Sequence, residues 1–313
     1  MSGVLLLTKL LVKNLVNVIF SLVNGLEIIL FILISVAFFS LFERKLMGLV
    51  HYRKGPNKVG VGGFLQPFAD AMKLISKIET TPTASVELLY WLSPLTTLFL
   101  SMIIWLVYPV IWGFFTSSSS MLIVLCIYSL SVYGVILSGW FSLSKYATIG
   151  CVRALAQSIS YEIGLTLVIL LVSLIFSSMS LEMFVSVPVF WSLWFMFPLF
   201  ILFEITLFAE TNRSPFDLAE GESELVGGFS VEYGGLSYTL IFLGENLALL
   251  FAGMISSILF FNGSIICSVI IIGLFVVIRS QLPRVRFDKV MKLFWEVILP
   301  LQMGLCLVVI CLI

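Results

Sequence analysis

The chain has 313 residues, of which 60% are hydrophobic and 11% charged, and its mean hydropathy is +1.17. A single core of this length cannot hide so much apolar surface, which excludes a soluble globular protein and indicates an integral membrane protein. The formal net charge is zero, so the chain lacks the basic surface that binds nucleic acid.

Residues 1–21 precede the first long hydrophobic run and form an N-terminal extension. Lys9, Lys13 and Asn17 stand four residues apart, on one face of a helix, which predicts a helix at the membrane interface. A cleaved signal peptide is the alternative. It is less favoured because no small-residue cleavage site follows the apolar run.

Eight hydrophobic runs are candidates to cross a bilayer, which takes about 20 residues. They fall at residues 22–46, 88–112, 121–142, 154–177, 190–208, 236–261, 265–280 and 290–313, the seventh being short. We therefore predict an all-α integral membrane protein, one transmembrane domain over residues 1–313 with about eight transmembrane helices.

An amphipathic surface helix is predicted at residues 64–79, between the first two runs. Its apolar residues recur at steps of three and four, and polar residues occupy the other face. The apolar set is Phe64, Leu65, Phe68, Met72 and Ile75, and the polar set is Asp70, Lys73 and Lys77.

Charge predicts the orientation of the chain. All Lys and Arg residues except Lys9 and Lys13 lie in or beside the loops that follow the first, third, fifth and seventh runs. By the positive-inside rule these loops face the cytoplasm or the mitochondrial matrix. Because almost every polar residue lies on this face, we expect it to dock a partner; ordinary insertion signalling is the alternative.

The loop at residues 209–235 holds six carboxylates against one base, Arg213. The carboxylates are Glu210, Asp217, Glu220, Glu222, Glu224 and Glu232. Crowding near a low dielectric raises the pKa of some carboxyl groups, so the loop is a candidate proton store. A solvated acidic loop between two membrane helices is the alternative.

Among the carboxylates inside hydrophobic runs we single out Glu162, Glu204 and Glu245. A charge at mid-helix costs ~2.5 to 3.5 kcal/mol, so such groups are functional candidates. Tyr161 and Tyr233 are near enough in sequence to donate hydrogen bonds to them. Structural pairing between helices is the alternative.

Basic residues border the first loop and the surface helix, with one carboxylate between them. They are Arg44, Arg53, Lys54 and Lys73, and the carboxylate is Asp70. The alternative to a binding role is contact with lipid headgroups.

Cysteine and histidine usage excludes several redox sites. The five cysteines stand in or beside apolar segments without CxxC spacing, which argues against disulfides, structural zinc and iron–sulfur clusters. His51 is the single histidine, so a haem with two axial imidazoles is excluded. We expect no metal site and no redox centre in this chain.

Five stretches resemble, in the expected order, the signatures of the subunit 1 family of respiratory NADH:ubiquinone oxidoreductase (complex I). They are FERKLMGLVHYRKGPNKVG (42–60), QPFADAMKLISK (66–77), RALAQSISYE (153–162), AETNRSPFDLAEGESELVGGFSVEY (209–233) and LPRVRFDKVM (282–291). The resemblance covers nearly the whole chain after roughly the first twenty residues.

The resemblance implies a core membrane subunit that forms part of the quinone chamber and couples quinone reduction to proton translocation. Ubiquinone would be the substrate, while NADH, FMN and the iron–sulfur clusters would be bound by partner subunits. The implied partners are quinone-module subunits of the peripheral arm, neighbouring membrane-arm subunits and lipid. The implied location is the mitochondrial inner membrane, or the plasma membrane of a bacterium.

The resemblance also assigns residues. Glu162, Glu210 and Glu245 match acidic positions of the family's proton relay, to which we add Tyr161, Glu220, Glu222, Glu224, Glu232 and Tyr233. The quinone channel would be lined by Arg44, Arg53, Lys54, Asp70, Lys73, Arg213 and Asp217, with Phe242 offering an apolar wall for the quinone tail.

Four positions depart from the family's pattern. Leu49 and His51 stand where Tyr and Gln are frequent, Asn246 where Tyr is common, and Glu204 where an apolar residue is usual. Two other readings stay open: the homologous membrane subunit of an energy-converting hydrogenase, and a secondary transporter. A transporter should show two pseudo-repeated halves, and no such repeat is visible in the sequence.

Overall fold

The computed structural model describes residues 2–83, 85–109, 118–186, 193–219, 221 and 227–312, with side chains from Phe20 onward except at 193–195 and 312. Within these residues the chain is helical and has no strand, which confirms the predicted all-α class. The elements are α1 (Ser2–Val50), η1 (Val61–Gly63), α2 (Gln66–Ile75), α3 (Glu87–Trp105), α4 (Ser120–Phe141), α5 (Lys145–Phe176), α6 (Leu181–Ser186), α7 (Leu193–Glu210), η3 (Gly228–Ser230), α9 (Gly235–Phe261), α10 (Ile265–Gln281), α11 (Phe287–Lys292), the π-helical η4 (Leu293–Ile298) and α12 (Leu299–Leu312).

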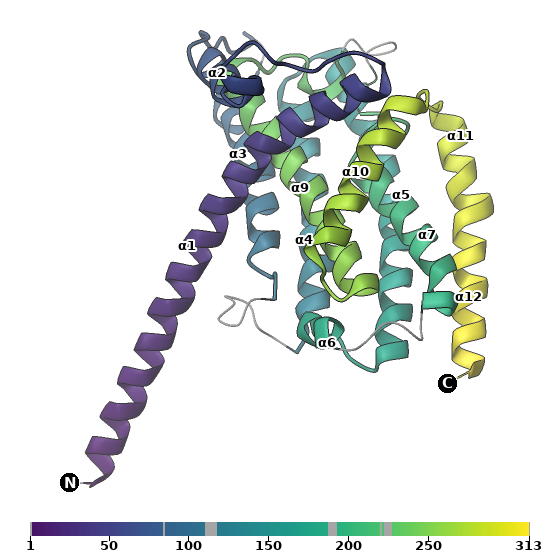
Figure 1. The fold of residues 1–313 in the computed structure, drawn as a ribbon. Coiled ribbons are helices and arrows are strands. Elements are labelled where there is room, and N and C mark those ends of the chain that lie inside the picture. The colour runs from purple at the N-terminus through teal and green to yellow at the C-terminus, as the bar shows by residue number, and fades with distance from the viewer. Residues whose placement is uncertain are drawn as a thin grey trace.

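Six of the described helical segments are long and apolar enough to cross a membrane. They are α1 from Phe20, α3, α4, α5, α9 and the combined segment Phe287–Cys311. The helices α7 and α10 have 18 and 17 residues and run through the same bundle (Figure 1). The count of eight crossings stays a prediction.

Two helix starts differ from the expected ones. The N-terminal extension and the first hydrophobic run form one continuous helix, α1, of 49 residues. At 1.5 Å per residue this is about 70 Å, more than twice the thickness of the bilayer's hydrocarbon core. The helix α5 begins at Lys145 and not near Ala154, because the Ser144 hydroxyl accepts a hydrogen bond from the Ala147 N–H and caps it.

The polar connections gather at one end of the bundle, which we call the loop end (Figure 1). It holds the described parts of the connections at 51–86, 211–234 and 282–286. The turns at 177–180 and 262–264, and both chain termini, lie at the opposite end. This arrangement agrees with the orientation predicted from charge.

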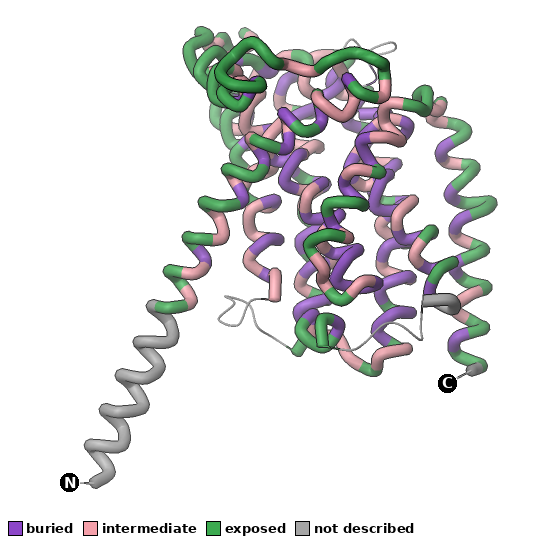
Figure 2. The backbone as a smooth tube through the Cα atoms, in the orientation of Figure 1, coloured by how far each residue is buried: buried purple, intermediate pink, exposed green. Residues whose placement is uncertain are grey.

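The helix α9 is the most buried of the six candidate crossings (Figure 2). It packs against α3, α10, α1 and α7. A Cβ on Gly253 would lie 2.4 Å from the Ile272 side chain, so glycine is needed for the close approach of α9 and α10. Because α9 is enclosed, its polar residues Glu245 and Asn246 lie within the bundle.

The surface helix α2 is shorter than the predicted 64–79 at both ends, with Leu65 as its N-cap and Ser76 as its C-cap, and the chain before it turns through glycines. Gly60, Gly62 and Gly63 have positive φ angles, and a Cβ on Gly63 would lie 2.1 Å from the Pro56 carbonyl oxygen. The helix still leaves Phe68 and Met72 more than half exposed, so it has the predicted apolar face.

Candidate functional site

The described part of the acidic loop is folded into the protein. Arg213 and Asp217 are each only 7% exposed. The Gln157 side-chain amide donates hydrogen bonds to the carbonyls of Ala209 and Phe216, both at 2.8 Å, and so ties the loop to α5. For residues 209–219 the solvated-loop alternative is therefore wrong. Glu220, Glu222 and Glu224 lie outside the described residues.

A buried charge cluster joins this loop to three helices. We call it the Glu43 cluster: Glu43, Arg213, Asn246 and Arg279. One carboxylate oxygen of Glu43, a residue 5% exposed, accepts a hydrogen bond from Arg213 at 2.9 Å and another from Arg279. The other arm of the Arg213 guanidinium donates to the Asn246 amide oxygen. The cluster therefore locks α1, α9, α10 and the loop together.

Asn246, which stands where the family commonly has Tyr, has a structural role in this cluster. Its side chain is fully buried, and its amide nitrogen donates to the Phe242 carbonyl at 2.9 Å while its oxygen holds Arg213. Sequence reasoning missed Glu43 and Arg279 as well. Their signal was present, since both are charged residues near the ends of hydrophobic runs.

Asp217, four residues after Arg213, has a different partner. Its carboxylate lies 2.9 Å from Arg284, which comes from the connection between α10 and α11. That connection is also joined to the loop through the Val285 N–H, which donates to the Pro215 carbonyl at 3.0 Å. Arg213 and Asp217, which the sequence analysis placed together in the quinone channel, therefore belong to different ion pairs.

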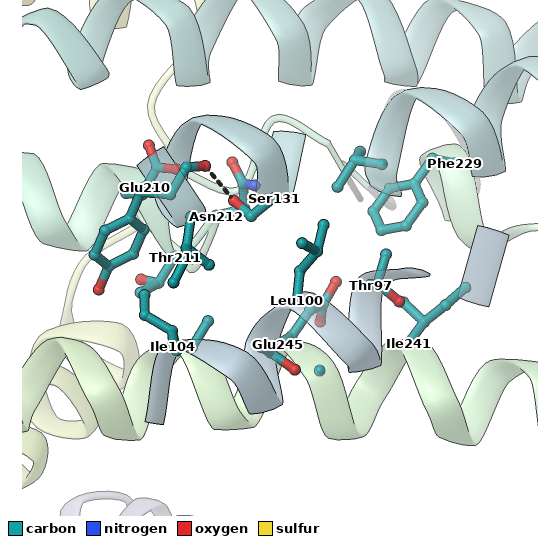
Figure 3. A pocket seen from close by; sticks show the side chains of 16 residues that line it. Thr97, Leu100, Ile104, Ser131, Glu210, Thr211, Asn212, Phe229, Ile241 and Glu245 are labelled. Atoms are coloured by element: carbon teal, nitrogen blue, oxygen red, sulfur yellow. Dashed lines mark hydrogen bonds between the residues drawn. The ribbon is translucent and has the colours of Figure 1, made fainter. Parts of the chain in front are cut away.

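Two of the predicted relay carboxylates line one cavity of about 90 Å³ inside the bundle. Figure 3 shows Glu210 and Glu245 on opposite sides of it, with Ser131 and Asn212 also on its wall. One Glu210 carboxylate oxygen is buried without a hydrogen-bond partner among the described residues. A cavity of this volume with several polar groups can hold several water molecules, which could carry protons between the carboxylates.

Glu162 and Tyr161 are neighbours in α5, but their side chains lie in different surroundings. Glu162 is half-buried and close enough to Glu210 for their charges to interact. Tyr161 is fully buried, with its ring 4.7 Å from that of Phe294 and its hydroxyl donating to the Val290 carbonyl at 3.4 Å. Tyr161 therefore packs against the C-terminal segment and does not line the Glu210 cavity.

Tyr233 is held by hydrogen bonds at the start of α9. Its hydroxyl lies 2.9 Å from that of Ser93 and donates to the Ser138 carbonyl at 3.1 Å, and its ring stacks on Tyr90. Burial raises the pKa of Tyr233 to about 12, so the phenol keeps its proton at neutral pH. The neighbouring Glu232 accepts a hydrogen bond from the Tyr90 hydroxyl through its backbone carbonyl.

The basic residues of the first loop split into two groups. Arg44 forms an ion pair with Asp70 at 2.7 Å, which fastens α2 to α1. Arg53, Lys54 and Lys73 are exposed at the loop end and form no ion pair within the described part of the chain.

Phe242 and Glu79 make two further contacts at α9. The ring of Phe242 stacks beside that of Tyr238, away from the wall of the Glu210 cavity. Glu79, which sequence reasoning missed, accepts the N–H groups of Leu236 and Ser237 and so caps α9. Among the described residues no three His, Cys, Asp or Glu side chains could together hold a metal ion.

Comparison with known proteins assigns the chain to a family. A model of the family described as NADH dehydrogenase matches residues 23–310. The chain belongs to this family. It is 44% identical over 292 residues to NADH-ubiquinone oxidoreductase chain 1 of Aedes aegypti, covering 91% of this chain and 93% of that protein.

Other relatives from this NADH dehydrogenase family carry the same name. The chain is 43% identical to the protein of Locusta migratoria over 288 residues, covering 90% of this chain and 92% of that protein. It is 42% identical to that of Artemia franciscana over 281 residues, covering 89% and 94%. The resemblance seen in five stretches of sequence is thus confirmed over most of the chain.

Proposed function

We propose that this chain is a core membrane subunit of proton-pumping NADH:ubiquinone oxidoreductase in the mitochondrial inner membrane. In this role it forms part of the quinone chamber and couples quinone reduction to proton translocation. The observation that carries the proposal is that Glu210 and Glu245 line one internal cavity. This cavity lies next to the loop in which the charged residues Arg213 and Asp217 are buried.

The loop end supplies the polar side of the quinone chamber. Arg213 and Asp217 are held there by Glu43 and Arg284, so that side has charges in fixed positions. The exposed apolar residues of α2 offer a surface for an isoprenoid tail. Subunits of the peripheral arm, with NADH, FMN and iron–sulfur clusters, would dock at this end and deliver the electrons.

Reduction of ubiquinone takes up protons and changes the charge beside the loop. A change of charge alters the protonation of nearby buried carboxylates, because like charges disfavour ionisation. Glu162 interacts with Glu210, and Glu210 shares its cavity with Glu245, so these groups form the next proton acceptors inside the membrane. Coupling follows from electrostatics without a redox centre in this chain.

The alternative is the homologous membrane subunit of an energy-converting hydrogenase, which need not bind quinone. The names of the similar animal proteins favour the ubiquinone enzyme. Purification separates the two: the proposed subunit should co-purify with flavin and iron–sulfur subunits that oxidise NADH. A transporter would purify without them.

Replacing Glu162 by Gln tests the relay. The substitution keeps size and hydrogen bonding but removes the titrating group, so we expect a larger loss of proton translocation than of assembled enzyme. The measurement is the ratio of protons moved to NADH oxidised in reconstituted vesicles. Glu182→Gln in α6 is the matched control, since Glu182 is exposed at the opposite end. Wild-type turnover with an unchanged ratio in Glu162→Gln would show that Glu162 is a helix-packing residue and not part of the relay.

Glu204 is expected to lie outside the relay. Both its carboxylate oxygens are buried without a hydrogen-bond partner among the described residues, and Ser256 of α9 is close to it. Glu204 does not line the Glu210 cavity. We expect Glu204→Gln to keep coupled turnover within about twofold of wild type, a change of less than ~0.5 kcal/mol in the barrier. Retained electron transfer with lost proton pumping would contradict this expectation.

A further inference from the structure

A second hollow of the described chain is apolar and lies away from the proposed relay. It is a groove of about 520 Å³ between α7, α10 and the C-terminal segment. We call it the C-terminal groove, and its walls include Ile205, Phe208, Phe275, Ile278, Leu293 and Leu301. Glu204 also borders it, but the Glu204 carboxylate oxygens are buried, so the groove presents no charge along its length.

The outer wall of this groove faces outward. Leu293, Val297 and Leu301 line it, yet each stays well exposed. Figure 2 shows the C-terminal segment at the edge of the bundle, with exposed residues along its length. In a membrane this wall meets lipid or another chain.

Positive charge is concentrated at the loop end of the groove. Between residues 284 and 292 the chain has four basic side chains, Arg284, Arg286, Lys289 and Lys292, and one acidic side chain, Asp288. Arg284 is paired with Asp217 and Arg286 with Asp288. Lys289 is exposed, and no ion pair within the described residues engages it.

Lys289 lies close in sequence to the groove wall. It lies in α11 and precedes Leu293, the first lining residue of the C-terminal segment, by four residues. Lys289 therefore lies about one helical turn before the first apolar residue of the wall. An apolar slot capped by a cation matches the two parts of an anionic phospholipid.

We propose that the C-terminal groove binds one acyl chain of an anionic phospholipid, with its phosphate held by Lys289 at the loop end. The positive charge at one end of an apolar groove favours this occupant over an apolar helix of a neighbouring subunit. The proposal is independent of the quinone and relay assignments.

Binding to the purified, delipidated complex tests the site. Native mass spectrometry would count molecules of dioleoyl-phosphatidylglycerol bound, with dioleoyl-phosphatidylcholine as the zwitterionic probe. Lys289→Gln is expected to weaken phosphatidylglycerol binding about fivefold, the effect of one lysine near an anionic surface. Val297→Trp fills the groove and should remove this bound molecule altogether.

The matched controls change similar side chains elsewhere. Lys145→Gln removes another exposed lysine at the loop end, and Leu307→Trp enlarges an exposed residue of α12 outside the groove. Both should bind phosphatidylglycerol as the wild type does. Equal binding of the two lipids, or unchanged binding in Lys289→Gln, would overturn the proposal.

A cross-link gives a second and independent result. Val297→Cys should react with a maleimide carried by a lipid, and a cross-link from Val297→Cys to a neighbouring subunit would assign the groove to a protein helix instead. If Val297→Trp fails to assemble, Lys289→Gln and the cross-link still decide, since both change exposed positions.

Discussion

Replacing Arg213 by Met is expected to remove most of the assembled, quinone-reducing complex. The Glu43 carboxylate would stay buried with Arg279 as its remaining cationic partner in the cluster, and the Asn246 amide oxygen would lose its donor. Breaking a buried ion pair by removing one partner costs about 3 to 5 kcal/mol, a large part of the stability of a typical domain. Blue native gels and the thermal inactivation midpoint measure the loss.

The matched control is Arg286→Met. Its pair with Asp288 lies at 3.1 Å, but both side chains are mostly exposed, so the pair contributes about 0 to 1 kcal/mol. Removing Glu43 together with Arg213 should be milder than removing Arg213 alone, because no buried anion is then left underpaired. Wild-type amounts and thermal stability in Arg213→Met would show that the Glu43 cluster does not stabilise the fold.

The second large effect is expected from Glu210→Gln. The variant keeps the shape of the cavity but cannot carry a proton between Glu162 and Glu245. Coupled turnover should fall about 100-fold, the low end of the contribution of a positioned proton-transfer group, while assembly is retained. The measurement is proton translocation in vesicles alongside NADH oxidation with an artificial acceptor that takes electrons at the flavin.

Two further variants test whether the effect is specific to Glu210 and whether Glu210 and Glu245 act together. Ser131→Ala changes the same cavity wall without removing a titrating group and should pump nearly as the wild type does. If Glu210 and Glu245 act in one relay, removing both should be little worse than removing Glu210 alone, because residues that act as a unit are non-additive. Fully additive losses would place the two carboxylates on separate routes.

Much of the fold could be predicted because bilayer crossing imposes a local rule on composition. The runs at 121–142 and 236–261 match α4 and α9 closely, since each is predominantly apolar and is bounded by loop residues. The start of α5 was missed because a serine cap, and not hydropathy, decides where that helix begins. The short α2 was overextended because the pattern of apolar and polar residues continues past Leu65 and Ser76, which cap the helix.

The candidate site was predicted less completely. Glu210, Glu245 and Glu162 were singled out because a carboxylate in or beside an apolar run is costly and therefore informative. Glu43, Arg279 and Arg284 were missed as partners of Arg213 and Asp217, since ion pairs across helices depend on which faces meet. Tyr161 was grouped with Glu162 by adjacency, although successive residues of a helix point about 100° apart.

The sequence by itself determined the membrane class, the charged face and the carboxylates worth testing, because composition and charge along the chain reflect the low dielectric of the bilayer. Only the tertiary structure decided which charges are paired, which carboxylates share a cavity and where an apolar groove opens. These depend on contacts between residues far apart in the chain, such as Arg213 with Glu43, whose geometry follows from helix packing and not from local sequence.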